Sequence, residues 1–268
     1  MDEELAGGKL LLDRPAEAVS RLTIANPERR NALDHEILDA IAEVLPQLDR
    51  GIESRCVIVT GAPPLFSAGY DIAGIPEETF ERDAEALVAH PFHAAMEAIS
   101  HHPWPVLAAL NGHCLGGGLE LAITCDLRIC ARGAKLGMPP AKLGLIYGHT
   151  GLRKFLDTIG LAHTKELFLT GRNLDAERAE RIGLVTEVVE DGEVADVAVA
   201  LAAAIAANAP LSMRGNKRAI DLLNANPELT DQQEAGLVAL RESCFSSADF
   251  REGIRAFAEK RRAQWTGR

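Results

Sequence analysis

Short apolar runs alternate with longer periodic segments over the first two thirds of the chain. Lys9–Asp13 and Val19–Ala25 have the composition of short strands, and Cys56–Thr60 has that of a buried strand. Between them, apolar side chains recur at helical spacing over Glu36–Leu48. Asp34 stands where a helix N-cap would lie, so the pattern predicts a capped helix there.

The alternation continues to about residue 150 and then gives way to helical patterns. Pro105–Leu110 and Leu127–Cys130 are predicted as strands, and Gly116–Thr124 as an apolar helix opened by glycines. Beyond these segments, Leu184–Val188 is the one further stretch with strand character. This succession favours an α/β fold followed by a helical region.

The change of pattern predicts an α/β core over residues 1–200 and a helical part over residues 201–268. A chain of 268 residues buries enough surface to fold without disulfides. No two of its cysteines form a Cys-x-x-Cys pair, and they stand among apolar neighbours. We therefore expect buried free thiols in a reducing compartment, the cytoplasm: Cys56, Cys114, Cys125, Cys130 and Cys244.

The charge is negative overall but uneven. The net charge of −11 argues against broad nucleic-acid binding. Arg251–Arg268 holds six Lys/Arg and two Asp/Glu, a net of +4, so the remainder has −15. This basic tail is either a solvated helix face or a local site for an anion. The N-terminus lacks an apolar signal segment, and Val194–Ala207 is too short to span a bilayer, so no membrane association is expected.

The glycine run Gly116–Gly118 stands between a predicted strand and a predicted helix. Glycines allow close backbone approach, and free N–H groups at a helix N-terminus favour an oxyanion or phosphate. The run lacks the Gly-Lys-Ser/Thr of a P-loop and the spacing of a dinucleotide fingerprint. Taken alone, it is also explained as a tight turn with close helix packing.

Another glycine loop, Leu65–Ile72, also follows a buried strand and is called the first loop because it comes earlier in the chain. If the two strands are neighbours, both loops meet at one edge of the sheet. Each could then supply one N–H group to a single carbonyl oxygen. The pair of loops predicts an oxyanion hole more strongly than either loop alone.

These loops carry a resemblance to a known family. Phe66-Ser-Ala-Gly-Tyr-Asp-Ile72, followed by Asn111-Gly-x-x-x-Gly-Gly-Gly-x-Glu-Leu-Ala-x-x-Cys-Asp126, is similar to the enoyl-CoA hydratase/isomerase (crotonase) superfamily. The similarity runs from Asn26 to Arg261. It implies a crotonase-like spiral of ββα units with a helical C-terminal trimerisation region. It also implies acyl-CoA substrates, an enolate intermediate, and a homotrimer or a dimer of trimers.

The resemblance assigns roles to individual positions. The oxyanion hole would consist of the N–H groups of Tyr70 and Gly117. No metal and no separate cofactor is expected, because coenzyme A enters as part of the substrate. The resemblance implies contacts with coenzyme A, some from a neighbouring subunit, at these positions: Ala68, Gly69, Asp71, Ile72, Phe257, Lys260 and, as a weaker candidate, Arg29.

One position departs from the hydratases of this family, which use two glutamates. Glu120 matches the first, but Pro140 stands where the second is expected, and proline is neither an acid nor a base. The segment Met138–Tyr147 is similar to the methylmalonyl-CoA decarboxylase branch, in which a matching tyrosine lies beside the acyl group. That branch has histidine in place of Tyr70.

We therefore expect an acyl-CoA lyase that decarboxylates a short alkylmalonyl-CoA, with Glu120 and Tyr147 near the α-carbon. One alternative is an enoyl-CoA hydratase or isomerase that uses Glu120 alone. A non-catalytic CoA-binding or RNA-binding homologue is another. Glu120 could also be an ordinary first-turn acid, and Tyr147 a packed core residue. Cys114 is explained as a small buried residue, and His149 either as a structural histidine, the favoured explanation, or as a residue that lines the pocket. The remaining histidines are explained as solvated surface groups: His90, His93, His101 and His102.

Overall fold

The computed structural model of the chain describes residues 3–71, 88–226 and 228–268. Seven strands form the main sheet in the order β1-β2-β3-β4-β5-β7-β10, and β6-β8-β9 form a small second sheet. The strands are β1 Glu3–Leu5, β2 Leu10–Ala16, β3 Val19–Ile24, β4 Cys56–Gly61, β5 Val106–Leu110, β6 Cys114–Leu115, β7 Leu127–Ala131, β8 Lys135–Gly137, β9 Leu174–Asp175 and β10 Glu187–Val189.

Pairing in the main sheet is antiparallel from β1 to β3 and parallel from β3 to β10. The strands β4 and β5 are direct neighbours, with Val57 opposite Val106. Both strands are buried along nearly their whole length, as expected for parallel strands covered on both faces. The loops that follow β4 and β5 therefore leave the sheet side by side.

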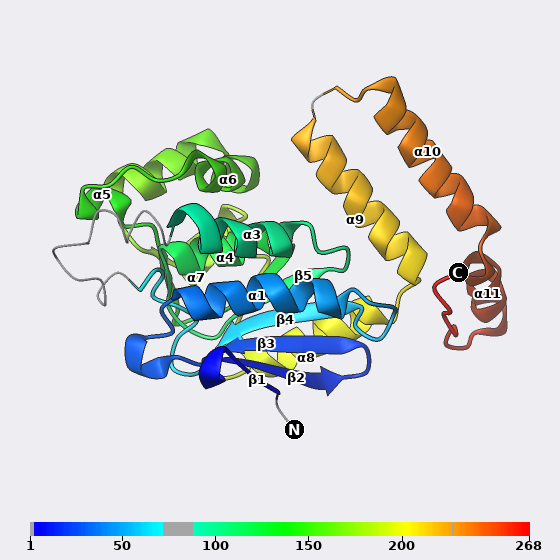
Figure 1. The fold of residues 1–268 in the computed structure, drawn as a ribbon, viewed down its shortest axis with the longest axis horizontal. Helices are drawn as coiled ribbons and strands as arrows, with labels where there is room; N and C mark the ends of the chain where they lie inside the picture. The colour runs from blue at the N-terminus through cyan, green and yellow to red at the C-terminus, as the bar shows by residue number, and fades with distance from the viewer. Residues whose placement is uncertain (1–2, 72–87, 227) are drawn as a thin grey trace.

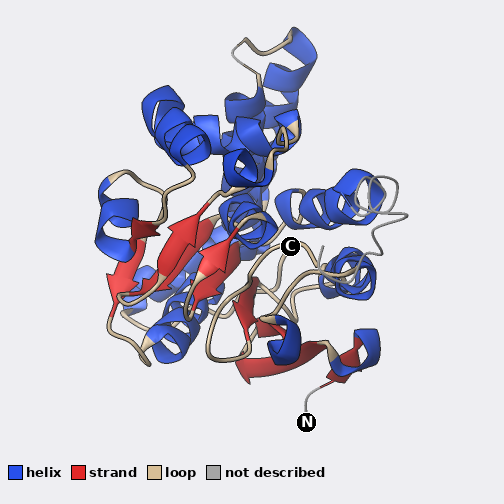
Figure 2. Cartoon of the chain, turned by 90° about the vertical axis from the view of Figure 1, so that its left-hand side faces the viewer, coloured by secondary structure: helices blue, strands red, loops and turns tan. Residues whose placement is uncertain are grey.

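Helices surround the sheet (Figures 1 and 2). Helix α8 packs against the main sheet through alanines, whose small side chains allow a close approach. The helices are α1 His35–Leu48, α3 His93–Ser100, α4 Gly117–Thr124, α5 Pro140–Leu143, α6 His149–Thr170, α7 Ala176–Arg181, α8 Val194–Ala206, α9 Pro210–Ala225, α10 Asp231–Ser246 and α11 Ala248–Glu259. Shorter helical turns cover Ala6–Gly8, Pro27–Arg29 and Val88–Phe92.

Most predicted elements are confirmed. The Asp34 carboxylate accepts a hydrogen bond from the Ile37 N–H at 3.0 Å and caps α1 as expected. The strand prediction at Leu184–Val188 is wrong at its start, because β10 begins only at Glu187. The N–H of Leu184 donates to the Ala179 carbonyl at 2.9 Å, so this apolar residue belongs to the turn that ends α7.

The C-terminal helices α9, α10 and α11 extend away from the sheet (Figure 1). Residue 200 lies inside α8, and α10 has no buried residue; the division of the chain near residue 200 stays a prediction. Within the described ranges, no single helix has the length and apolarity of a membrane span, although the pair α8 and α9 passes that test together with a bend of 104°.

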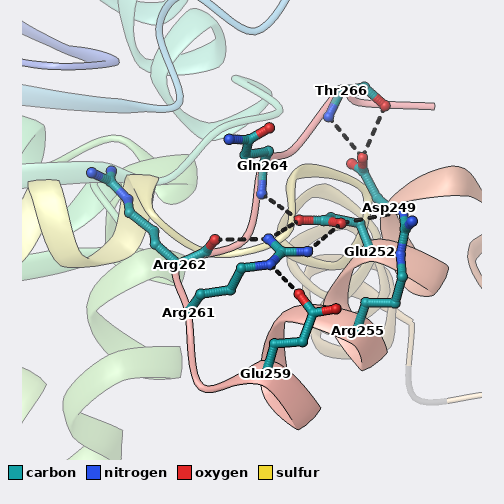
Figure 3. Close-up of polar contacts among 8 residues, drawn as sticks. All are labelled: Asp249, Glu252, Arg255, Glu259, Arg261, Arg262, Gln264 and Thr266. Atoms are coloured by element: carbon teal, nitrogen blue, oxygen red, sulfur yellow. Dashed lines mark hydrogen bonds and ion pairs between the residues drawn. The ribbon is translucent and has the colours of Figure 1, made fainter.

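The last residues of the chain fold back onto α11 and connect it to the body of the protein. Arg261 donates to Glu252 at 2.6 Å, and the N–H of Gln264 donates to the same carboxylate at 2.9 Å (Figure 3). The Trp265 indole donates to the carbonyl of Ala207, at the end of α8, at 2.7 Å. The position of α11 therefore depends on this polar tail rather than on a large apolar contact.

Candidate active site

Backbone pairing holds the two glycine loops together. The Leu115 N–H donates to the Ser67 carbonyl at 3.0 Å, and the Ser67 N–H donates to the His113 carbonyl at 3.3 Å. These bonds form a parallel bridge between Ser67 and Cys114. The condition set by the sequence, that the loops follow neighbouring strands, is met.

A third segment supports the first loop from behind. Asn31 is fully buried in the left-handed conformation, with φ of +52°. Its amide group donates to the carbonyls of Ala62 at 2.7 Å and Leu65 at 2.8 Å. In return, the Ser67 hydroxyl donates to the Asn31 carbonyl at 2.7 Å. Neither Asn31 nor Ser67 was predicted as a functional residue. For Asn31, the local signal was that asparagine tolerates the left-handed conformation better than most residues do.

Tyr70 is oriented by pairing with Leu33. The Leu33 N–H donates to the Gly69 carbonyl at 2.8 Å, and the Asp71 N–H donates to the Leu33 carbonyl at 3.0 Å. In a parallel bridge of this kind, the N–H of the middle residue points to the other side. The Tyr70 N–H makes no hydrogen bond to any residue that the structure describes.

Gly117 is the first residue of α4, where an N–H group has no partner within the helix. Gly69 lies against it: a Cβ atom added to Gly69 would be 3.0 Å from the Gly117 nitrogen and 2.9 Å from the Leu115 carbonyl oxygen. Gly69 also has φ of +97°, which disfavours other residues. The free N–H groups of Tyr70 and Gly117 therefore lie on adjoining segments, as an oxyanion hole requires.

Close packing also explains part of the glycine run. A Cβ atom on Gly117 would be 2.9 Å from the Tyr70 ring, and one on Gly118 would be 2.7 Å from the Ser67 Cβ. The tight turn with close helix packing is thus observed, and the oxyanion hole stays a prediction. The tight turn is what brings the two N–H groups together.

Glu120 lies one turn into α4 with only 5% of its surface exposed. The Tyr147 hydroxyl donates to Glu120 Oε2 at 2.5 Å, and the Tyr70 hydroxyl lies 3.4 Å from that of Tyr147. Gly151 in α6 makes room for the carboxylate, since a Cβ there would be 2.6 Å from Glu120 Oε1. The structure thus brings Tyr70, Glu120 and Tyr147 together beside the glycine loops.

The surroundings shift the protonation of all three groups. Burial raises the pKa of Glu120, although the hydrogen bond from Tyr147 and the charge of Lys154 lower it in part. Burial, together with the Glu120 charge, raises the pKa of both Tyr70 and Tyr147. The two phenols therefore stay neutral, while Glu120 holds a proton more readily than an exposed glutamate.

These groups line a cavity of about 1950 Å³ that extends from Tyr70 between α4 and α6 to α9. This volume exceeds the range of about 300–1,000 Å³ usual for small-molecule sites. His149 lies on its wall and is exposed, so it lines the pocket as one of the two predictions allowed. Among the described residues, no group of three or more His, Cys, Asp or Glu side chains could hold a metal ion.

Other predicted contacts fall in different places. Ala68, Gly69 and Asp71 belong to the first loop, and Arg29 reaches Asp71 at 3.8 Å. Phe257 is 88% exposed on α11, which lies at the other end of the molecule from α5 (Figure 1), and Lys260 ends that helix. Within one chain they do not meet the glycine loops. Ile72 lies outside the described residues.

The departure at Pro140 is visible in the structure. Pro140 is buried at the start of α5, and Pro139 approaches Gly116, with its Cδ 4.0 Å from the position of an added Cβ. The residue that approaches the glycine turn is thus Pro139, while Pro140, at the position of the second glutamate, has no acidic or basic group. Among the described residues, Glu120, Tyr147 and Tyr70 are the clustered groups beside the glycine loops that carry an exchangeable proton.

Comparison with known proteins agrees with this geometry. A sequence model of the Enoyl-CoA hydratase/isomerase family matches residues 14–268. The chain belongs to this family. It is 34% identical over 251 residues to the short-chain-enoyl-CoA hydratase of Clostridium acetobutylicum, covering 92% of this chain and 93% of that protein. The structure of an enoyl-CoA hydratase from Bacillus anthracis superimposes with a TM-score of 0.87 at 32% identity, covering 97% and 100% of the two chains.

Family membership confirms the crotonase-like α/β fold and identifies the chain as an enzyme of the enoyl-CoA hydratase/isomerase group. An acyl-CoA substrate is consistent with that group. These comparisons give no specific support to the decarboxylase branch, and several relatives are named as hydratases. The reaction at the α-carbon is therefore a matter of proposal.

Proposed function

We propose that the protein hydrates or isomerises an enoyl-CoA, with Glu120 as the acid and base and Tyr147 as its hydrogen-bond partner. The observation that supports this most is the 2.5 Å hydrogen bond between the Tyr147 hydroxyl and Glu120, beside the oxyanion hole. Burial raises the pKa of the Glu120 carboxyl group, so it returns a proton less readily than an exposed glutamate and accepts one more readily. Hydration and isomerisation need such a group, whereas decarboxylation does not.

The reaction follows from the placement of charge. The thioester oxygen accepts hydrogen bonds from the Tyr70 and Gly117 N–H groups, which hold the negative charge of the enolate. One such donor typically lowers the barrier by roughly 3–4 kcal/mol. In hydration, Glu120 takes a proton from water, the oxygen of that water bonds to the β-carbon to give the enolate, and the protonated Glu120 then gives that proton to the α-carbon. In isomerisation, Glu120 moves one proton between the α- and γ-carbons.

Tyr147 compensates in part for Pro140. Its neutral hydroxyl stabilises the ionised form of Glu120 and orients the carboxylate. In this arrangement a carboxyl–phenol pair does the work for which other hydratases of the family use two glutamates.

Decarboxylation of a short alkylmalonyl-CoA is a second candidate, favoured by Pro140 and by the neutral Tyr147. The bond between the α-carbon and the carboxylate breaks, its electrons enter the thioester, and CO2 leaves. Tyr147 would then protonate the α-carbon. This reaction requires Glu120 to be protonated, since an ionised Glu120 would repel the substrate carboxylate.

Phe257 and Lys260 lie far from the glycine loops of their own chain, which fits an oligomer. We propose that the chain forms a homotrimer or a dimer of trimers in the cytoplasm. Phe257 and Lys260 of one subunit would then approach the nucleotide end of coenzyme A bound to a neighbour. The exposed Phe257 and the net positive tail support this assignment.

The test is to incubate the protein with crotonyl-CoA, methylmalonyl-CoA and ethylmalonyl-CoA and to follow each by mass. A gain of one water on crotonyl-CoA, lost in Glu120→Gln, supports the main proposal. Loss of CO2 from a malonyl thioester without hydration of crotonyl-CoA would replace it with decarboxylation. Equal turnover by wild type and Tyr147→Phe would remove Tyr147 from the chemistry.

A further inference from the structure

Lys154 is a half-buried lysine on the wall of the same cavity. It lies on α6, about one helical turn beyond Gly151, the residue that contacts the Glu120 carboxylate. Its charge acts on Glu120 and on Cys125, which follows the end of α4. An acyl chain that leaves the oxyanion hole and passes Glu120 along α4 and α6 would therefore approach Lys154.

The Lys154 ammonium group forms no hydrogen bond and no ion pair with any residue in the described part of the chain. Burial lowers its pKa, which is the expected effect on a cation with incomplete solvation. The Lys154 side chain has lost part of its solvation, and an anion placed beside the ammonium group would offset that loss.

The acidic groups nearby are largely engaged elsewhere. Asp157 pairs with Arg153 at 2.8 Å, and Asp126 pairs with Lys217 at 2.6 Å. Burial raises the pKa of Asp221, so this carboxyl group ionises less readily than an exposed one. The Cys125 thiol, with a pKa raised to about 12 by burial, is neutral. Glu120 is hydrogen-bonded to Tyr147, so the Lys154 ammonium group is available to a ligand.

We propose that Lys154 binds a carboxylate at the far end of the acyl group, so that the enzyme prefers thioesters of dicarboxylic acids. This inference rests on the proposed function, because it takes the acyl group to run from the oxyanion hole past Glu120. In this role Lys154 determines specificity and takes no part in the proton transfer.

The test measures binding of saturated thioesters, which the enzyme cannot hydrate, by isothermal titration calorimetry. Three pairs of equal chain length are compared: butanoyl-CoA with succinyl-CoA, pentanoyl-CoA with glutaryl-CoA, and hexanoyl-CoA with adipoyl-CoA. In at least one pair, the carboxylate member should bind about tenfold more tightly to the wild type, as one charge-assisted hydrogen bond allows. Lys154→Met should abolish that preference, and Lys154→Arg should keep part of it.

Lys165→Met is the matched control, since it removes the same charge from an exposed position on the same helix. It should leave the preference unchanged. The proposal is overturned if the wild type prefers the methyl-ended member at every length, or if Lys154→Met weakens both members of each pair equally. Failure of the proposed function would look different, because the wild type would then bind neither member or would turn over no enoyl-CoA.

Discussion

The glycine loops and the C-terminal helices are held in place by different kinds of contact. Around the oxyanion hole, backbone hydrogen bonds join three segments of one chain, and Asn31, Ser67 and Gly69 are all buried. In the C-terminal region, α10 buries no residue, and α11 is held by the tail through Glu252 and Arg261 (Figure 3). Hydrogen bonds to Arg261 and Gln264 lower the pKa of Glu252 to about 2.

The difference shows which functions one chain can supply alone. The proposed oxyanion hole takes both of its N–H groups from one chain, and local backbone pairing fixes them. The C-terminal helices present apolar side chains to solvent, among them Ile254 and Phe257. They are the part whose role depends on a second subunit, as the proposed trimer requires. Substitutions around the glycine loops should therefore change turnover, whereas a substitution in the C-terminal region should change local hydrogen exchange.

Glu120→Gln should have the largest effect on activity, a loss of about 10³-fold in kcat. In the wild type, kcat/KM should rise with pH at an apparent pKa above the ordinary value of 4.5, because burial raises the pKa of Glu120. Activity assays over a pH series test this, with exposed Glu43→Gln on α1 as the control. An unchanged acidic limb in Glu120→Gln would contradict the assignment.

Glu120→Gln should lower activity but should not lower the stability of the fold at neutral pH. A carboxyl group with a raised folded pKa contributes stability below its unfolded pKa and loses it as pH rises through the folded value. Glu120→Gln should therefore unfold at the same or a higher temperature than the wild type at neutral pH.

Gly118→Val should reduce turnover by about 10²-fold, because the new side chain would displace Ser67 and separate the two N–H groups. Circular dichroism checks that the fold is retained, and acyl-CoA turnover measures the loss. Gly236→Ala in α10, where an added Cβ meets nothing within 4 Å, is the control and should have full activity. Full activity in Gly118→Val would show that the packing does not position the hole.

Asn31→Ala should lower kcat by about tenfold and destabilise the fold by roughly 1–3 kcal/mol, because it leaves the half-buried carbonyls of Ala62 and Leu65 without this donor. Urea unfolding and steady-state kinetics measure the two effects. Asn216→Ala in α9 provides a comparison outside the loops, because the Asn216 amide donates to the Ser212 hydroxyl at 3.3 Å and to no carbonyl in the described part of the chain. If Asn31→Ala lowers stability alone, Asn31 supports the core and not the hole.

Glu252→Gln should have the smallest effect on chemistry. It weakens the charged contact with Arg261, so hydrogen exchange should rise in residues 261–268 while the strands of the sheet stay protected. Glu242→Gln on the exposed face of α10 should change neither. Faster exchange throughout the sheet would mean that the tail and the core unfold together.

Local patterns predicted most elements of the core, since strand composition, helical spacing and the Asp34 cap depend on neighbours in sequence. They failed for β6 and β9, which have two residues each and no periodicity to detect. They also misplaced the start of β10, because the apolar Leu184 packs in a turn rather than in a strand. Length and context, not composition, decided these segments.

The sequence by itself determined the family, the two glycine loops, the presence of Glu120 and Tyr147, and the loss of the second glutamate at Pro140. Only the tertiary structure decided that β4 and β5 are neighbours, that Asn31 holds the first loop, and that the Tyr147 hydroxyl reaches Glu120. The reason is physical. Backbone conformation and amphipathic pattern are local, whereas a hydrogen bond between residues far apart in the chain, the pKa of a buried carboxyl group and a lysine left without a partner exist only once the chain is packed.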